Sequence, residues 1–432
     1  MKKILILTII ILTIYLFSCN SIEPPSGLTI NLTLEDASCT EAWITLSSNL
    51  RLPATVELKQ NNQTIKTINL TKPDSLLFID SLLPNTSYTF QASNSAYRVT
   101  SNQLQLATLD TTSHNFTWQT WTFGEHSSSV LYDVAIINEN SIYAVGEIYM
   151  NDTLGQPDPT PYNAIHWNGT SWDTMRIPTK TFSGTTVSSV IKTIFSFNEN
   201  DIWTFSIAGS YSHWNGSNWE TEFVIERDGS GSKFWGISSS RMYLVCNNGG
   251  ITYYDGTNWQ KLESGTELNI NDIWGDYNEN ASEWEILIVG GNIFQSTERI
   301  ILKINNANQV QQISPDGTIE YPLSSVWFKS NIEYYVSGDG IYSSINLNNY
   351  WQNLNLPNYY GFSIRGAGLN DIVVCGGAGY VGHFNGYSWK NYLDGELQEI
   401  TGNYYSTAIK GNTIAAVGNT AEGKAIAVIG KR

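Results

Sequence analysis

The sequence predicts an all-β protein in which a small β-sandwich is followed by a seven-bladed β-propeller. A short segment built around Asn-Gly or Asp-Gly recurs between residues 166 and 389, and apolar strands recur with it. Periods of about 40 to 50 residues built from short strands are typical of propellers. The composition agrees with this prediction, because 12% of the residues are aromatic and only 14% are charged, as expected for many half-buried strands.

The recurring segment leads through Asn-Gly or Asp-Gly to a Trp. Its full copies are residues 166–172, 213–219, 253–259 and 383–389, and 348–351 is a weaker copy. Asn-Gly between two apolar runs is the strongest short-range signal for a hairpin, because Asn, Asp and Gly tolerate positive φ. We therefore expect each copy to form a two-residue type I′ turn, with positive φ at both central residues, between two strands.

The N-terminus has the pattern of a targeting segment. Two lysines precede an apolar run from Ile4 to Phe17, which is too short for a comfortable membrane span and has the flanks of a signal peptide. Leu16-Phe17-Ser18-Cys19 resembles a bacterial lipobox, although Phe17 is bulkier than the usual residue. The resemblance implies that residues 1–18 are a lipoprotein signal peptide and that Cys19 is lipidated. An ordinary signal peptide or an uncleaved anchor is the alternative.

Asn20, directly after Cys19, implies by the same resemblance an outer-membrane lipoprotein of the cell envelope, with the leaflet left open. Residues 19–27 then form a tether. Residues 28–110 contain seven short alternating strands, the number and spacing of an immunoglobulin-like sandwich. Leu83-Pro84-Asn85-Thr86-Ser87-Tyr88 resembles the segment of fibronectin type III domains in which a Tyr makes the tyrosine corner, and Trp43 matches their core Trp. The resemblance implies a spacer module.

Residues 115–432 form the predicted propeller. Its seven second strands are expected around 142–146, 202–205, 242–246, 285–289, 333–336, 372–375 and 414–418. The last blade ends after residues 425–429 without a fourth strand, whereas Trp118-Gln119-Thr120 resembles the fourth strands of other blades. We therefore expect residues 116–123 to pair beside 425–429 and to close the ring without an open edge.

The repeats resemble those of two propeller families. Gly376-Gly377 followed by Trp389 is similar to a kelch-like blade. The turns also resemble the Asp-box, Asp-x-Gly-x-x-Trp, but the Gly comes one residue earlier here, and this departure argues against sialidase-like chemistry. The whole layout resembles bacterial lipoproteins with a fibronectin type III-like domain and a propeller, which implies no particular activity.

No cofactor or metal is expected. His166, His213 and His383 occupy one position of the repeat in different blades, where they do not converge, so a structural role is favoured over a zinc site. The repeated Trp residues are interpreted as packing between blades. Cys246 and Cys375 are interpreted as buried small hydrophobes. The net charge of −16 and the lack of basic runs exclude nucleic-acid binding.

The ligand site is expected on the face that carries the inter-blade and second-to-third-strand loops. An insertion at residues 147–163 opens there, and long irregular insertions on a rigid scaffold often carry function. The candidate ligand-binding residues are Tyr149, Asp152, Asp158, Tyr162, Asp228, Tyr359 and Tyr360. We predict a monomeric, non-catalytic binding or scaffold protein for protein or glycan. The alternative is a glycan-active hydrolase or lyase, which would need two close carboxylates, or a base with an Arg or a metal, at the funnel centre.

Overall fold

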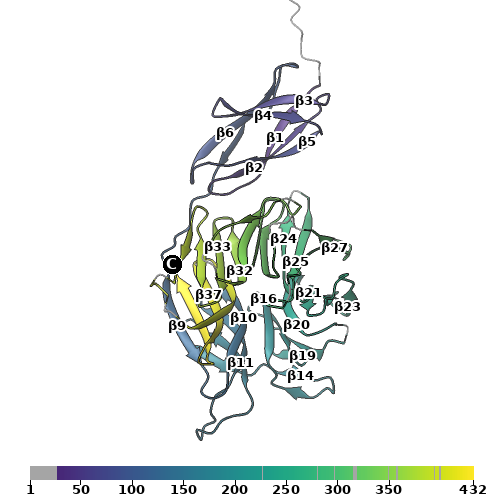
Figure 1. Ribbon diagram of the computed structural model, residues 1–432. Helices are drawn as coiled ribbons and strands as arrows, with labels where there is room; N and C mark the ends of the chain where they lie inside the picture. The colour runs from purple at the N-terminus through teal and green to yellow at the C-terminus, as the bar shows by residue number, and fades with distance from the viewer. Residues whose placement is uncertain are drawn as a thin grey trace, which may run out of the picture. The chain divides into compact units, whose positions relative to one another are not determined.

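The computed structural model describes residues 27–225, 227–279, 281–295, 297–314, 319–348, 350–356, 359–393, 395–397 and 400–432. Cys19 and the targeting segment lie outside these residues. The chain divides into two compact units, residues 1–108 and 109–432, and the secondary structure within the described ranges consists of strands (Figure 1). None of the described residues forms a helix long and apolar enough to cross a membrane.

The first unit is a two-sheet sandwich. One sheet has the order β1-β2-β5, and the other has the order β4-β3-β6-β7 with β8 also paired to β6. Its strands are β1 (Ile30–Ala37), β2 (Ala42–Ser48), β3 (Ala54–Gln60), β4 (Gln63–Leu70), β5 (Asp74–Ile79), β6 (Ser87–Asn94), β7 (Val99–Thr100) and β8 (Leu104–Ala107). Alternating side chains of both sheets, such as Leu32, Val56 and Phe90, form one buried core. The Tyr88 hydroxyl accepts a hydrogen bond from the Leu83 amide at 2.9 Å, as the tyrosine-corner resemblance implies.

The second unit is a β-propeller that contains seven four-stranded sheets in the described residues. The first strands, which contact one another in succession, are β10 (Val130–Asn138), β16 (Ile191–Asn198), β20 (Gly231–Ser238), β24 (Ile270–Asn278), β28 (Leu323–Lys329), β32 (Gly361–Gly368) and β36 (Gly402–Lys410). The second strands are β11 (Ser141–Ile148), β17 (Asp201–Ser206), β21 (Arg241–Cys246), β25 (Glu283–Gly290), β29 (Glu333–Gly338), β33 (Asp371–Gly376) and β37 (Thr413–Thr420).

The third strands are β12 (Tyr162–Trp167), β18 (Ser210–Trp214), β22 (Ile251–Tyr254), β26 (Ile300–Ile304), β30 (Gly340–Ser344), β34 (Val381–Phe384) and β38 (Ala425–Lys431). The outer strands are β13 (Trp172–Met175), β19 (Trp219–Phe223), β23 (Trp259–Leu262), β27 (Val310–Ile313), β31 (Gln352–Asn353), β35 (Trp389–Asn391) and β9 (Thr117–Phe123). All seven predicted second strands fall within observed second strands. They could be predicted because a buried middle strand is a nearly continuous apolar run.

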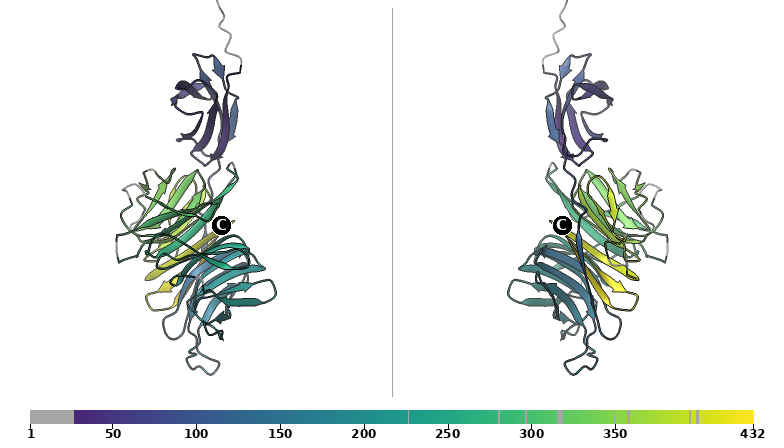
Figure 2. Two further views of the ribbon diagram at one scale, coloured as in Figure 1. Left: turned by 90° about the vertical axis from the view of Figure 1, so that its right-hand side faces the viewer. Right: turned by 90° about the vertical axis from the view of Figure 1, so that its left-hand side faces the viewer.

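Strand β9 joins the start of the propeller unit to its end. It pairs antiparallel with β38, from Thr117 opposite Lys431 to Phe123 opposite Ala425. Figures 1 and 2 show the blue β9 beside the yellow C-terminal strand. The pairing of residues 116–123 with 425–429 was expected from the sequence. It covers an edge of β38 that would otherwise present unpaired backbone groups.

The Asn-Gly turns differ from the expected type I′ geometry. Gly169 has a φ of 95°, but Asn168 does not have a positive φ, and Trp167 pairs with Trp172 across a four-residue loop. The Asn168 side-chain oxygen accepts hydrogen bonds from the Thr170 and Ser171 amides, both at 3.0 Å. The same side-chain cap recurs at Asn215, Asp255 and Asn385. The two-residue prediction was wrong because the Asn or Asp side chain closes the loop in place of a backbone turn.

The repeated histidines form contacts within their own sheets, and a repeated tryptophan packs between neighbouring sheets. His166 contacts Ser141 at 3.1 Å, His213 contacts Asp201 at 2.9 Å, and His383 contacts Asp371 at 2.8 Å, each in its own sheet. Trp259 packs against Tyr211 of the preceding blade at 5.8 Å between ring centroids. Among the described residues no group of three or more potential ligands could hold a metal ion. These repeat positions therefore support the blades.

Candidate binding site at the channel mouth

Every first strand of the propeller carries a β-bulge near its beginning. In β10, for example, Leu131 pairs with Gly146 and Asp133 with Val145, so that Tyr132 is an extra residue. The seven extra residues are Tyr132, Lys192, Ser232, Asn271, Ser324, Phe362 and Tyr405. A bulge re-aims the side chain of its extra residue, and bulges are common next to functional sites. All seven line one cavity of about 90 Å³ at the mouth of the central channel.

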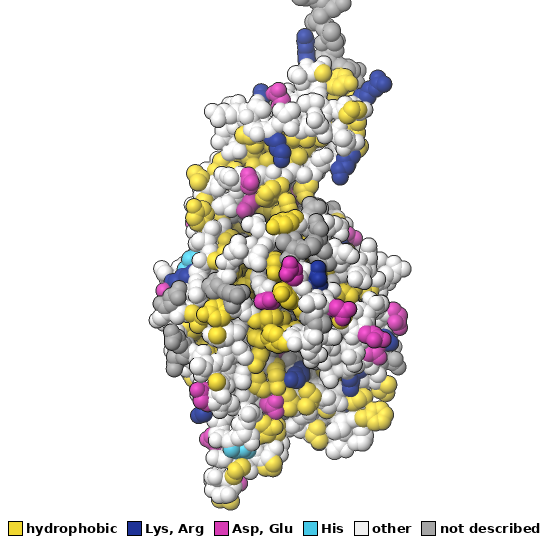
Figure 3. Space-filling model, in the orientation of Figure 1, with side chains coloured by type: hydrophobic (Ala, Val, Ile, Leu, Met, Phe, Trp, Pro, Cys, Tyr) yellow, Lys and Arg dark blue, Asp and Glu magenta, His cyan; other side chains and the backbone are white. Residues whose placement is uncertain are grey.

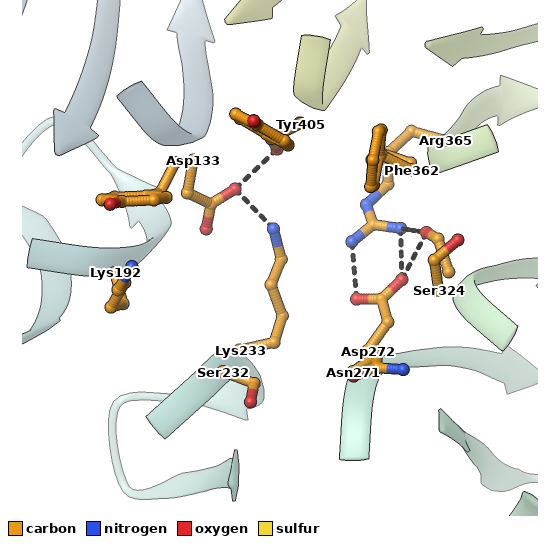
Figure 4. A pocket seen from close by; sticks show the side chains of 14 residues that line it. Asp133, Lys192, Ser232, Lys233, Asn271, Asp272, Ser324, Phe362, Arg365 and Tyr405 are labelled. Carbon is orange, nitrogen blue, oxygen red and sulfur yellow. Dashed lines mark hydrogen bonds and ion pairs between the residues drawn. The ribbon is translucent and has the colours of Figure 1, made fainter. Parts of the chain in front are cut away.

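The residues that follow the bulges form a buried polar layer beneath the mouth, shown in Figure 4. Asp133 is 1% exposed, and its Oδ1 accepts hydrogen bonds from Lys233 Nζ at 2.5 Å and Ser406 Oγ at 2.7 Å. Its Oδ2 accepts from Thr193 Oγ1 at 2.8 Å and from the Ile194 amide at 2.9 Å. One carboxylate thus bonds to three other blades.

A second carboxylate joins the three remaining blades. Asp272 is bound by both terminal nitrogens of Arg365, each at 2.8 Å, and by Ser325 Oγ at 2.5 Å. Burial alone would raise the pKa of Asp272, but the Arg365 guanidinium outweighs burial and holds that pKa below its usual value. Burial likewise opposes the charge of Arg365, and the Asp272 carboxylate raises the Arg365 pKa in compensation.

These two carboxylates do not have the arrangement that glycoside hydrolysis needs. Asp133 and Asp272 are each almost inaccessible, and each accepts at least four hydrogen bonds. A general acid or a nucleophile must reach the substrate with a free oxygen. The cavity above them can take the tip of one side chain. Asp133 and Asp272 therefore hold blades together.

An aromatic row lies beside the cavity. It consists of Phe294, Tyr360, Phe362 and Tyr405. In that order, neighbouring ring centroids are 4.9, 4.9 and 5.1 Å apart. Phe294 is 77% exposed and has a φ of 60°, a backbone conformation that is strained for a bulky residue and often marks a functional position. The row brings together a loop after β25, the residue before β32, and two bulges.

Two further tyrosines lie in the blade next to that of Tyr405, where β10 contacts β36. The Tyr132 hydroxyl donates to Glu147 Oε1 at 2.9 Å, and the Tyr149 hydroxyl donates to Glu147 Oε2 at 3.2 Å. Lys192 Nζ lies 3.2 Å from the centroid of the Tyr132 ring. Burial raises the pKa of Tyr132, and the neighbouring Glu147 raises it further. The mouth thus combines aromatic surface with the ammonium group of Lys192.

Two of the seven residues expected to bind ligand lie in this region. Tyr149 contacts Glu147, and Tyr360 belongs to the aromatic row. Tyr359 stacks on Tyr380 with ring centroids 5.5 Å apart, and it lines a different pocket with Asp339. Asp228 forms an ion pair with Lys261 at 2.8 Å. The structure therefore does not gather the seven into one site.

The insertion after β11 is organised by its own contacts and projects away from the sheets (Figure 1). Asp152 accepts hydrogen bonds from the Leu154 and Gln156 amides at 2.8 Å. Asp158 pairs with Arg176 at 2.6 Å, and Arg176 lies over the Tyr162 ring. The insertion holds only part of the extra length of this repeat, since a hairpin of β14 (Thr179–Lys180) and β15 (Thr186–Val187) holds the rest.

Comparison with solved structures identifies the fold of the second unit. The structure of YCF48 bound to D1 peptide is similar with a TM-score of 0.53 and 14% identity, and the match covers 74% of this chain and 97% of that one. YCF48 from Cyanidioschyzon merolae has a TM-score of 0.51 and 13% identity, with 72% and 98% covered. The WD40 β-propeller domain of Doa1 has a TM-score of 0.50 and 12% identity, with 74% and 97% covered.

No protein-family model matches the sequence, and a search of curated proteins finds no match either. Identities of this size to solved structures indicate shared architecture alone. The chain therefore contains a β-propeller of the general kind found in YCF48 and in WD40 proteins.

Proposed function

We propose that this chain is a non-catalytic binding protein that holds a segment of a partner protein across the channel mouth of its propeller. The aromatic row is the observation that carries this proposal. Aromatic side chains supply a large contact area at low entropic cost and are enriched in protein interfaces. The YCF48 structure contains a D1 peptide, and a peptide on a propeller of this fold is the same class of ligand.

The row is also well placed to bind an extended segment. Two of its rings, Phe362 and Tyr405, are bulge residues of neighbouring first strands, so their spacing depends on the sheets behind them rather than on a loop. A preorganised surface loses little conformational entropy when it binds. In this proposal the seven sheets form a closed ring, with β9 as the outer strand of the last one, and the ring is the rigid support.

Substitution of Phe362 by Ala tests the proposal. Phe362 is at the centre of the row, and loss of such an interface anchor costs on the order of 2 kcal/mol, or roughly 30-fold in affinity. The full-length protein would be applied to an array of ten-residue peptides, and we expect a subset of peptides to lose binding in the Phe362→Ala protein. Tyr387→Ala is the matched control, because Tyr387 is a 66% exposed aromatic residue on a third-to-fourth-strand turn. The proposal would be contradicted if the Phe362→Ala and Tyr387→Ala proteins bound the same peptides equally well.

The proposal extends to the location of the protein. We place it in the bacterial cell envelope, anchored through a lipid on Cys19, with a fibronectin type III-like module as the spacer. The sheet order β1-β2-β5 against β4-β3-β6 and the Tyr88 hydrogen bond support that module. The outer membrane is the proposed site because Asn20 follows the lipidated Cys.

Cys19→Ala is expected to release the protein from the membrane fraction or to leave a larger, unprocessed precursor. Lipid modification requires the Cys19 thiol, and the apolar run alone is short for a stable membrane span. Cell fractionation and gel mobility measure both results. Ser18→Ala keeps a small residue at the preceding position and should be processed normally. A Cys19→Ala protein of unchanged size in the membrane fraction would contradict lipidation.

A further inference from the structure

Lys192 differs from the other cations of the channel. Lys233 and Arg365 each bind a buried carboxylate at hydrogen-bonding distance. Lys192, the extra residue of the β16 bulge, has no carboxylate within 4 Å in the part of the chain that the structure describes, and it is drawn apart from the ion pairs in Figure 4. Its contact is the face of the Tyr132 ring, which attracts a cation more weakly than an anion does.

The surroundings of Lys192 leave its charge only partly balanced. Burial lowers the pKa of Lys192, and Glu147 acts in the opposite direction from a distance beyond 4 Å. Both Glu147 oxygens already accept hydrogen bonds, one from Tyr132 and one from Tyr149. The carboxylate is thereby held in place beside the mouth. An ammonium group has three donors. Among the described residues Lys192 makes no side-chain hydrogen bond, so these donors can meet a ligand in the cavity that it lines.

We infer that the segment bound at the mouth presents one carboxylate, which occupies the cavity and forms an ion pair with Lys192. This inference rests on the proposed function and adds the chemistry of the ligand. The cavity of about 90 Å³ has room for the tip of a side chain or for a chain terminus. Phe362 and Tyr405 of the aromatic row line the same cavity. The row would therefore bind the apolar residues next to that carboxylate in the partner segment.

The charge of the whole molecule limits the ligand to few acidic groups. The chain has a net charge of −16, and its carboxylates are scattered over the visible face in Figure 3 rather than gathered in a patch. A strongly acidic ligand would be repelled on approach, whereas a single carboxylate close to Lys192 is within a Debye length of about 8 Å of that cation. A mostly apolar peptide with one carboxylate fits better than an acidic polysaccharide.

The test uses the full-length protein and arrays of ten-residue peptides attached by their N-termini. Each peptide is made with a free C-terminal carboxylate and as the C-terminal amide, and internal Asp and Glu are replaced by Asn and Gln in a parallel set. These two sets separate a chain terminus from an acidic side chain. We expect the acid forms in one of them to bind about tenfold more tightly than the neutral forms, the size of one charge-assisted contact.

Three variants decide whether Lys192 makes the contact. Lys192→Gln should remove the preference for the acid form, so that this variant binds the acid and the neutral form of a peptide equally. Lys192→Arg keeps the charge over the Tyr132 ring and should retain the preference. Lys410→Gln makes the same charge change on an exposed lysine at the far end of β36, and it should bind as the unmodified protein does. Melting curves of the three variants verify their folds.

The outcomes separate the two proposals. If acid and neutral peptides bind equally, and both lose binding on Phe362→Ala, the protein binds peptides but the carboxylate inference is wrong. If the preference survives Lys192→Gln, the carboxylate binds elsewhere and the inference is again wrong. If no peptide binds while an array of uronic-acid glycans does, the proposed function and the inference both fail.

Discussion

Replacement of Arg365 by Leu is expected to lower the free energy of unfolding of the propeller by about 3–5 kcal/mol, the usual cost of leaving a buried charge without its partner. Arg365 is 8% exposed and Asp272 is 2% exposed. The guanidinium also donates to the Val326 and Ile364 carbonyls, which belong to two different blades. Chemical denaturation followed by tryptophan fluorescence would measure the loss.

A double variant shows whether the cost comes from the unpaired carboxylate. Asp272→Asn together with Arg365→Leu removes both charges, and we expect it to be more stable than Arg365→Leu alone. Lys180→Ala is the control, because it breaks a surface ion pair with Glu222 at 2.7 Å, and such pairs contribute at most about 1 kcal/mol. If Arg365→Leu costs no more than Lys180→Ala, the buried network does not hold the blades together.

Loss of β9 is expected to have the largest effect on stability. The strand pairs with β38 over seven residues, and Trp118 packs on Tyr392 with ring centroids 4.9 Å apart. Gly430 faces the Trp118 ring so closely that an added Cβ would lie within 3 Å of it. Trp118→Ala alone should cost about 3 kcal/mol. Deletion of residues 109–124 should cost more, since it also exposes the backbone of β38.

Hydrogen exchange distinguishes this effect from general loosening. The amides of β38 should lose protection first in Trp118→Ala, while those of β21 in a distant blade keep theirs. Gln119→Ala is the control, because Gln119 is an exposed residue of the same strand. Normal protection of β38 in the deletion variant would mean that β9 does not support the last sheet.

Much of the architecture could be predicted because it depends on local patterns. The second strands are apolar runs such as Ile286-Leu287-Ile288-Val289, and a run of this kind has few alternatives to a buried strand. The partner of β38 could be found because Trp118-Gln119-Thr120 repeats the pattern of other outer strands. The turn type of the Asn-Gly loops was predicted wrongly because it depends on where the Asn168 side chain points. A two-residue motif does not specify that direction.

The candidate site could not be predicted in the same way. The unusual insertion predicted Asp152, Asp158 and Tyr162 as ligand-binding residues, but their contacts lie within the insertion and its flanks. The bulge residues show no single residue type, since Tyr132, Lys192 and Ser232 are aromatic, cationic and small polar. A signal was nevertheless present. When the first strands are aligned, one position is polar in all seven, as at Asp133 and Thr193, and the residue directly before it varies.

This variable position makes the propeller a suitable scaffold for engineering. A bulge residue is skipped in the pairing of its strand with the neighbouring strand, so a substitution there leaves the register of the pairs on both sides intact. The polar layer below it, centred on Asp133 and Asp272, can stay constant while the seven positions above it are randomised. A library built this way would vary the recognition surface as antibody loops are varied, and the randomised side chains would stand on strands rather than on loops.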